Sequence, residues 1–139
     1  MKYLLPVILI LSSLLLAACE PKNRRPGTWL SGELVEDRIE DWSFSNEFQE
    51  EFIQTHPWYG IPHSVTTVLA TADGKLYVPS VYVKEPKRFP DGKYWNRIVA
   101  EYPNVEVKIG DQLYPRTVNL ISDEAEFGRG LNALAAKYP

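Results

Sequence analysis

Apolar and polar side chains alternate along several short stretches of the chain, and a period of two residues is typical of half-buried β-strands. The most regular stretch is 104–109, in which two valines and an isoleucine alternate with polar residues. Gly110 and Asp111 follow it, and a two-residue turn of this kind joins antiparallel strands. We therefore predict a β-hairpin whose second strand lies within 112–121.

A second hairpin is predicted earlier in the chain. Residues 63–72 alternate β-branched side chains and end at Asp73-Gly74, which is a strong signal for a two-residue turn. Residues 75–83 return from this turn. Because Pro79 removes one backbone donor from the returning strand, we expect that strand to lie at a sheet edge or to contain a bulge.

Two segments nearer the N-terminus are further candidates for strands. Residues 28–36 form the first, and residues 42–55, which are rich in phenylalanine and glutamate, fit either a strand or a short helix. Glu36-Asp37 and Glu50-Glu51 are adjacent acids, which point to opposite faces of a strand, so we expect them at the surface.

A period near 3.6 residues indicates two helices. In the first, Asp91 is a candidate N-cap and Pro103 ends the helix. Its apolar stripe consists of Trp95, Ile98, Val99 and Tyr102. The second helix begins with the capping-box spacing of Asp123 and Glu126. Its stripe consists of Phe127, Leu131, Leu134 and Tyr138. Two glycines weaken its middle, so we expect docking of this stripe on the sheet to stabilise the helix.

Two helices and about six strands joined by hairpins predict a mainly β fold. An open antiparallel sheet of this size would leave its edges unpaired. We therefore expect a small antiparallel β-barrel with the helices packed on it.

The first residues differ in character from the rest. Residues 1–18 contain one positive charge, an apolar run and small residues before Cys19, which is the pattern of a secretory signal. The sequence Leu16-Ala17-Ala18-Cys19 resembles the bacterial lipoprotein signal, in which the peptide is cut before the cysteine and its sulfur is lipidated. The alternative is an uncleaved transmembrane anchor, but the apolar stretch 3–18 is at or below the length that spans a bilayer comfortably.

These observations divide the chain into a signal peptide (1–18), a lipidated cysteine with a flexible tether (19–28) and one folded domain (29–139). Cys19 is the only cysteine, so the folded domain can form no disulfide. The tether is rich in proline and basic residues and lacks apolar periodicity. Glu20 follows the cysteine, and by resemblance to Gram-negative lipoproteins this favours the outer membrane, with the domain facing the periplasm.

Charge and composition narrow the possible ligands. The net charge of −3 does not suggest a nucleic-acid partner. Acidic residues dominate 33–51 and basic residues dominate 75–97, so the basic segment is either an anion-binding side or a surface that keeps the domain soluble. His56 and His63 are the only histidines and have no cysteine near them, so we expect no metal site.

From Ile61 onward, the motifs follow a distinctive order. The motifs are Asp73-Gly74, Ser80, Lys87-Arg88, Trp95-Asn96, Tyr102-Pro103 and the hairpin start at 105–110. This order resembles the flavin-binding split-barrel superfamily, namely the pyridoxamine 5′-phosphate oxidase-like proteins and the deazaflavin-dependent nitroreductases. The resemblance covers about the last two-thirds of the mature chain and implies a split β-barrel.

The resemblance also implies a cofactor, FMN or a deazaflavin, and a possible oxidoreductase in which the cofactor carries the electrons. In that superfamily a basic loop and the start of the following helix help to hold the cofactor phosphate, often at a homodimer seam. Carried over to this chain, the cofactor-binding residues would be His63, Ser80, Lys87, Arg88, Lys93 and Trp95. His63 lies where the nitroreductase pattern tends to have an arginine.

Each of these residues also has a plainer interpretation. Trp95 lies on the predicted apolar stripe and fits the core, and Lys87 and Arg88 fit a solvated loop. Trp58 and Tyr59, in a turn bounded by prolines, are candidates for the core or for the rim of a pocket. The alternative function is therefore a cofactor-free lipoprotein that acts as an interaction or structural module of the envelope.

Overall fold

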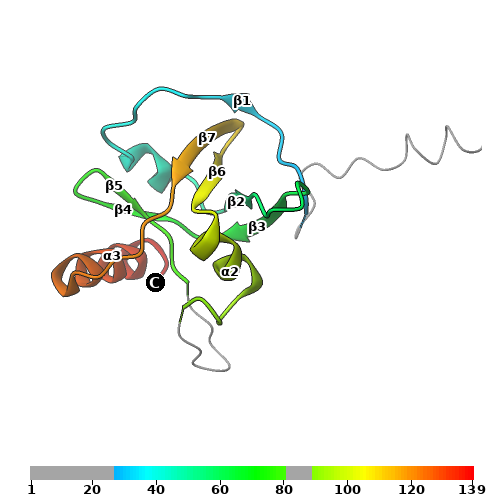
Figure 1. Cartoon of the computed structure of the whole chain (residues 1–139). Coiled ribbons are helices and arrows are strands. Elements are labelled where there is room, and N and C mark those ends of the chain that lie inside the picture. Colours follow the sequence, from blue (N-terminus) through cyan, green and yellow to red (C-terminus); the bar gives the residue numbers. More distant parts are fainter. Residues whose placement is uncertain (1–26, 81–88) are drawn as a thin grey trace, which may run out of the picture.

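The computed structural model describes residues 27–80 and 89–139. The predicted signal peptide, the predicted lipidation site Cys19, and Lys87 and Arg88 of the predicted cofactor site lie outside the described residues. The elements of the described part follow one another along the chain, and Figure 1 labels the strands and the helices α2 and α3. They are β1 (Glu33–Leu34), the 3-10 helix η1 (Ser43–Glu47), β2 (Glu51–Thr55), β3 (His63–Thr67), β4 (Ala70–Ala72), β5 (Lys75–Tyr77), α2 (Tyr94–Glu101), β6 (Asn104–Ile109), β7 (Gln112–Thr117) and α3 (Glu124–Lys137).

The strands form two sheets. A five-stranded sheet has the order β1-β7-β6-β2-β3, and β4 pairs with β5 in a separate two-stranded sheet. β1 runs parallel to β7, whereas the other pairs are antiparallel. The prediction of a mainly β fold with two helices is confirmed for the described residues. Within these residues, however, the larger sheet is mixed and the two sheets do not close into a barrel.

Both predicted two-residue turns are confirmed. Asp73 and Gly74, with φ of 52° and 73°, join β4 to β5, and Gly110, with φ of 58°, begins the turn between β6 and β7. Positive φ values are strained for most residues other than glycine. A Cβ atom added at Gly110 would also lie 2.9 Å from the ring of Phe48, so both the turn and its packing require glycine there.

The stretch 63–72 is not the single strand that its alternation predicted. β3 pairs with β2 and β4 pairs with β5, and the chain changes sheet at Val68 and Leu69. Leu69 is fully buried, and its N–H donates to Oε2 of Glu51 at 3.2 Å. A side-chain acceptor therefore satisfies the backbone donor at the break between β3 and β4.

Three other segments form shorter elements than the sequence pattern predicts. The segment 42–55 contains both predicted alternatives in succession, η1 and then β2. The returning strand β5 ends at Tyr77, before Pro79, as the missing backbone donor of proline leads one to expect. The long first strand predicted over 28–36 is reduced to the two residues of β1.

The main core lies on one face of the five-stranded sheet, beneath α2 and η1. The buried members of this core are Trp42, Ile53, Leu69, Trp95, Val99, Val105, Val107, Ile109 and Tyr114. Of the stripe predicted for α2, Tyr102 is the exception, because it lies at the C-cap and is exposed. The prediction that Asp91 caps this helix is wrong: Lys93 is the N-cap residue, and its side chain makes no capping hydrogen bond.

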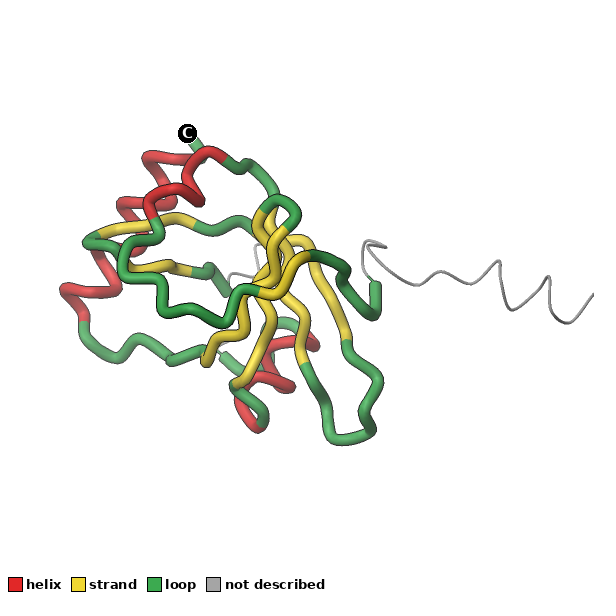
Figure 2. The backbone as a smooth tube through the Cα atoms, turned by 90° about the horizontal axis from the view of Figure 1, so that it is seen from above, coloured by secondary structure: helices red, strands yellow, loops and turns green. Residues whose placement is uncertain are grey.

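α3 packs beside the β4–β5 hairpin, as the two views in Figures 1 and 2 show. Asp123 caps it as predicted, because its Oδ1 accepts from the N–H of Glu126 at 2.7 Å. The predicted stripe is half right: Leu134 and Tyr138 are partly buried, and the Tyr138 hydroxyl donates to the carbonyl oxygen of Leu69 at 3.2 Å, whereas Phe127 and Leu131 are exposed. The helix instead approaches β5 through Gly130, where an added Cβ would lie 2.9 Å from the ring of Tyr77.

Candidate functional site

Two surface features lie at the start of α2, beside β3: a cluster of aromatic rings around His63 and a depression lined by Lys93. The ring of Tyr94, the first residue of α2, contacts the ring of His63 at the start of β3, with 5.4 Å between ring centroids. The preceding residue, Lys93, lines a depression together with Thr66 and Thr67 from the end of β3. The predicted site residues His63 and Lys93 therefore lie on either side of the same helix start.

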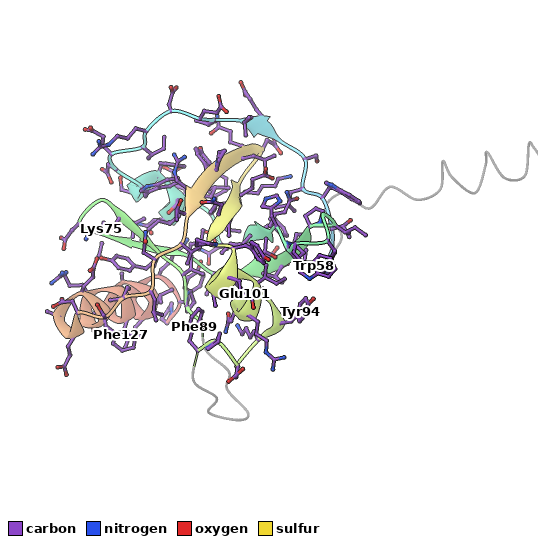
Figure 3. All side chains as sticks on the ribbon, in the orientation of Figure 1. Trp58, Lys75, Phe89, Tyr94, Glu101 and Phe127 are labelled. Carbon is purple, nitrogen blue, oxygen red and sulfur yellow. The ribbon has the colours of Figure 1, made fainter. Side chains whose placement is uncertain are left out.

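The first feature is an aromatic–histidine cluster made of Trp58, Tyr59, His63 and Tyr94. The Tyr59 hydroxyl is hydrogen-bonded to Nε2 of His63 and, at 3.1 Å, to the hydroxyl of Tyr94. Trp58 contacts the Tyr59 ring edge-on and is itself 79% exposed. Figure 3 shows Trp58 and Tyr94 on the same side of the molecule.

The connection between β2 and β3 explains why these rings are at the surface. Gly60 donates its N–H to the carbonyl oxygen of Pro57 at 3.0 Å, which closes a tight turn around Trp58 and Tyr59. Gly60 has a φ of 78°, which suits glycine. Pro57 and Pro62 are buried at the two ends of the turn. The two aromatic side chains are therefore carried outward on a short loop with anchored ends.

The hydrogen bond with Tyr94 is the main cause that raises the pKa of Tyr59 above its ordinary value of 10.0, and partial burial adds to it. The Tyr59 hydroxyl thus stays protonated at neutral pH and acts as a hydrogen-bonding group rather than a phenolate base. The cluster presents aromatic ring faces together with hydroxyl and imidazole groups. Such amphipathic side chains suit a contact that is apolar on one side and hydrated on the other.

The second feature is the depression, which has a volume of about 370 Å³ and is open to solvent. It is lined by Glu50, Thr66, Thr67, Val68, Pro79 and Lys93. Its volume is at the low end of the range of ligand pockets. The ammonium group of Lys93 and the positive end of the α2 dipole attract an anion, whereas the carboxylate of Glu50 repels one.

The structure separates the remaining predicted site residues. Trp95 is buried in the core cluster, so its ring does not line the depression. Ser80 is exposed and follows Pro79, which lines the depression, but Ser80 is not among the lining residues. For a flavin or deazaflavin, the described residues therefore fit only the anionic end of the molecule, through Lys93. They offer no aromatic wall from Trp95, so we derive no redox step.

A buried ion pair was missed by sequence reasoning. Glu51, expected at the surface, is fully buried, and Nζ of Lys137 donates to its Oε1 at 2.8 Å. The same ammonium group donates to the carbonyl oxygens of Ser45 at 3.0 Å and Leu69 at 2.8 Å. Burial raises the pKa of Glu51 above its ordinary 4.5, against the opposing effect of its hydrogen bond and charge interaction with Lys137.

One signal in the sequence does point to this burial. Glu51, Ile53 and Thr55 alternate along β2 and therefore share a face, and all three are buried. Because the ion pair is shielded from solvent and joins the end of α3 to the core, we assign it a structural role rather than a binding role.

Comparisons with family profiles, with curated proteins and with solved structures find no match to this chain. The resemblance to the flavin-binding split-barrel superfamily therefore rests on the order of sequence motifs and stays a prediction. No helix within residues 27–80 and 89–139 is long and apolar enough to cross a membrane. In the same part of the chain, no three or more His, Cys, Asp or Glu side chains gather closely enough to hold a metal ion.

Proposed function

We propose that this protein is a lipid-anchored interaction module of the bacterial envelope, attached through Cys19 with its domain facing the periplasm. The motif before Cys19 supports the anchor. One structural observation shows where the chain that follows the anchor joins the folded domain. Gly27 and Ser64 exchange two backbone hydrogen bonds of 3.0 Å, so the chain enters the domain along the free edge of β3. Cys19 lies eight residues earlier, so at most about 29 Å of extended chain joins the lipid to the domain.

Mass spectrometry of the N-terminal peptide from a membrane fraction tests the anchor. We expect the first residue of the mature chain to be Cys19 with attached fatty acids such as palmitate. Cys19→Ser should abolish both lipid attachment and cleavage, whereas Ser13→Ala in the apolar run should leave both intact. An unmodified Cys19 in the wild-type protein would contradict the proposal.

The choice of membrane is tested separately. We propose the outer membrane because Glu20, rather than aspartate, follows the cysteine. Density-gradient separation of the two membranes should place the wild-type protein in the outer fraction. Glu20→Asp removes a single methylene and should move the protein towards the inner fraction; equal distribution of the two forms would refute the assignment.

The assignment of an interaction module is supported by large apolar side chains exposed on two sides of the domain. Trp58 and Tyr94 belong to the aromatic–histidine cluster, and Phe127 and Leu131 lie on the outer side of α3. A homodimer through the α3 surface is part of this proposal. Light scattering of the purified protein should then give twice the monomer mass, and Phe127→Ser with Leu131→Ser should return it to the monomer mass.

A second candidate function is the binding of a flat anionic ligand, FMN or a deazaflavin, as the resemblance to the split-barrel superfamily implies. The depression at Lys93 and the start of α2 favours it. Addition of either ligand at tens of micromolar should quench its fluorescence and shift its visible spectrum. Lys93→Ala should weaken binding several-fold while Lys75→Ala, on β5, should not. Unchanged spectra with both ligands would remove this candidate.

A further inference from the structure

The aromatic–histidine cluster lies next to the point at which the tether enters the domain. Gly27 is bonded through its backbone to Ser64, and the neighbouring residue in β3 is His63 of the cluster. The ring of His63 contacts both Tyr59 and Tyr94. A chain that leaves the domain before Gly27 therefore starts from the same strand that supports the cluster.

The turn before β3 also exposes apolar surface. Trp58 is 79% exposed and Ile61, three residues later, is 49% exposed. Tyr59 lies between them, and its hydroxyl is held by His63 and Tyr94. An apolar tip with hydrogen-bonding groups behind it is the arrangement that tryptophan and tyrosine adopt at the interface between lipid and water.

We propose that the turn Trp58–Ile61 contacts the phospholipid bilayer beside the lipid anchor. The domain is then attached at two points, by the lipid on Cys19 and by this turn. The proposal rests on the proposed lipidation of Cys19 and names the partner of the interaction module.

The length and charge of the tether favour the bilayer as the partner. The reach of at most about 29 Å keeps the turn close to the membrane at all times, so even a weak contact forms at high effective concentration. The tether carries Lys22, Arg24 and Arg25 against Glu20 alone, and this excess of positive charge is attracted to anionic lipids.

Leu120 provides a control position outside both proposed contact surfaces. It lies in the connection between β7 and α3. Its side chain is 70% exposed, compared with 49% for Ile61. A serine substitution at Leu120 therefore changes at least as much exposed apolar surface without altering the turn Trp58–Ile61 or the α3 surface.

The test uses the full lipidated chain in vesicles of phosphatidylethanolamine and phosphatidylglycerol, with and without lipids brominated near the headgroup. Bromine quenches tryptophans that touch the lipid. Of the four tryptophans, Trp42 and Trp95 are buried and Trp58 is more exposed than Trp29. We expect brominated lipid to lower the emission of the wild-type protein. Trp58→Phe should reduce this quenching at least about twofold.

Ile61→Ser keeps all four tryptophans and should also reduce the quenching, whereas Leu120→Ser should leave it unchanged. Circular dichroism shows whether each variant is folded. If Cys19 carries lipid but quenching is absent, or is equal in all four proteins, the bilayer contact is refuted and the anchor stands. If Cys19 carries no lipid, both the anchor and the inference fail. Quenching of Trp58 by a soluble glycan fragment but not by brominated lipid would also overturn the bilayer as partner.

Discussion

Replacing Lys137 by methionine should destabilise the protein far more than the same replacement at an exposed lysine. The Lys137 side chain is 6% exposed, and its three donors serve Glu51, Ser45 and Leu69 at 2.8 to 3.0 Å. Methionine fills a similar volume but leaves the buried carboxylate of Glu51 with only the N–H of Leu69 at 3.2 Å and a distant hydroxyl of Tyr138 at 3.5 Å.

Removing one partner of a buried ion pair costs about 3–5 kcal/mol. Glu51 can relieve part of this cost by taking up a proton, so we expect a loss near about 3 kcal/mol at neutral pH. For a domain of this size, that loss corresponds to a fall in Tm of about 10–15 °C. Because a typical domain is stable by only about 5–15 kcal/mol, the variant should remain folded but should unfold at clearly lower urea concentration.

The pH dependence of this loss has a defined sign. Since burial raises the pKa of Glu51 in the folded protein above 4.5, its contribution to stability is complete below pH 4.5 and is lost as the pH rises through the folded pKa. Without Lys137 that pKa rises further, so the variant loses more stability over this range. The difference between wild type and Lys137→Met should therefore widen from about pH 4.5 to about pH 7.

Urea unfolding followed by circular dichroism and tryptophan fluorescence measures these differences. The matched control is Lys75→Met, because Lys75 forms an ion pair of 2.7 Å with Glu126 but its side chain is 63% exposed. The double variant Glu51→Gln with Lys137→Met removes both charges and should recover part of the stability. Equal midpoints for Lys137→Met and Lys75→Met, or no recovery in the double variant, would refute the reasoning.

Three further predictions concern α3 and its contacts. Gly128→Ala should stabilise the protein by up to about 1 kcal/mol, since an added Cβ meets no atom within 4 Å, whereas Gly130→Ala should lower the Tm because its Cβ would meet a tyrosine ring at 2.9 Å. Asp123→Ala should cost about 1 kcal/mol in urea unfolding through loss of the N-cap, and an unchanged midpoint would contradict this. The hydrogen bond from Lys75 lowers the pKa of Glu126. The stability that this ion pair contributes is therefore present above pH 4.5 and is lost as the pH falls through the pKa of Glu126 in the folded protein. Lys75→Met should thus lose less stability than the wild type on acidification from about pH 5 to about pH 3.

Predictions from local patterns succeeded where neighbouring residues decide the structure. The turn at Asp73-Gly74 and the turn that begins at Gly110 follow from the conformations that these residues adopt easily. The cap at Asp123 follows from a spacing of three residues to Glu126. None of these features requires knowledge of a distant part of the chain.

Predictions failed where a distant contact decides the structure. The alternation over 63–72 indicated one strand, but the chain breaks where Leu69 is bonded to Glu51 of another strand. In α3 the period of apolar residues predicts the helix correctly, but its first half docks through Gly130 rather than through Phe127 and Leu131, because the helix approaches the ring of Tyr77 closely there. Periodicity reports which side chains share a face and cannot report what covers it.

The candidate site divides in the same way. The sequence alone pointed to His63 and Lys93, the residue types that suit hydrogen bonding and anion binding, and a local motif predicted a lipid anchor at Cys19. Only the tertiary structure showed that Tyr94 contacts His63, that Trp95 is taken up by the core, and that the tether enters beside the exposed turn. The first two facts depend on the packing of α2 against the five-stranded sheet, which brings Tyr94 to His63 and is set by burial of apolar surface rather than by any local preference.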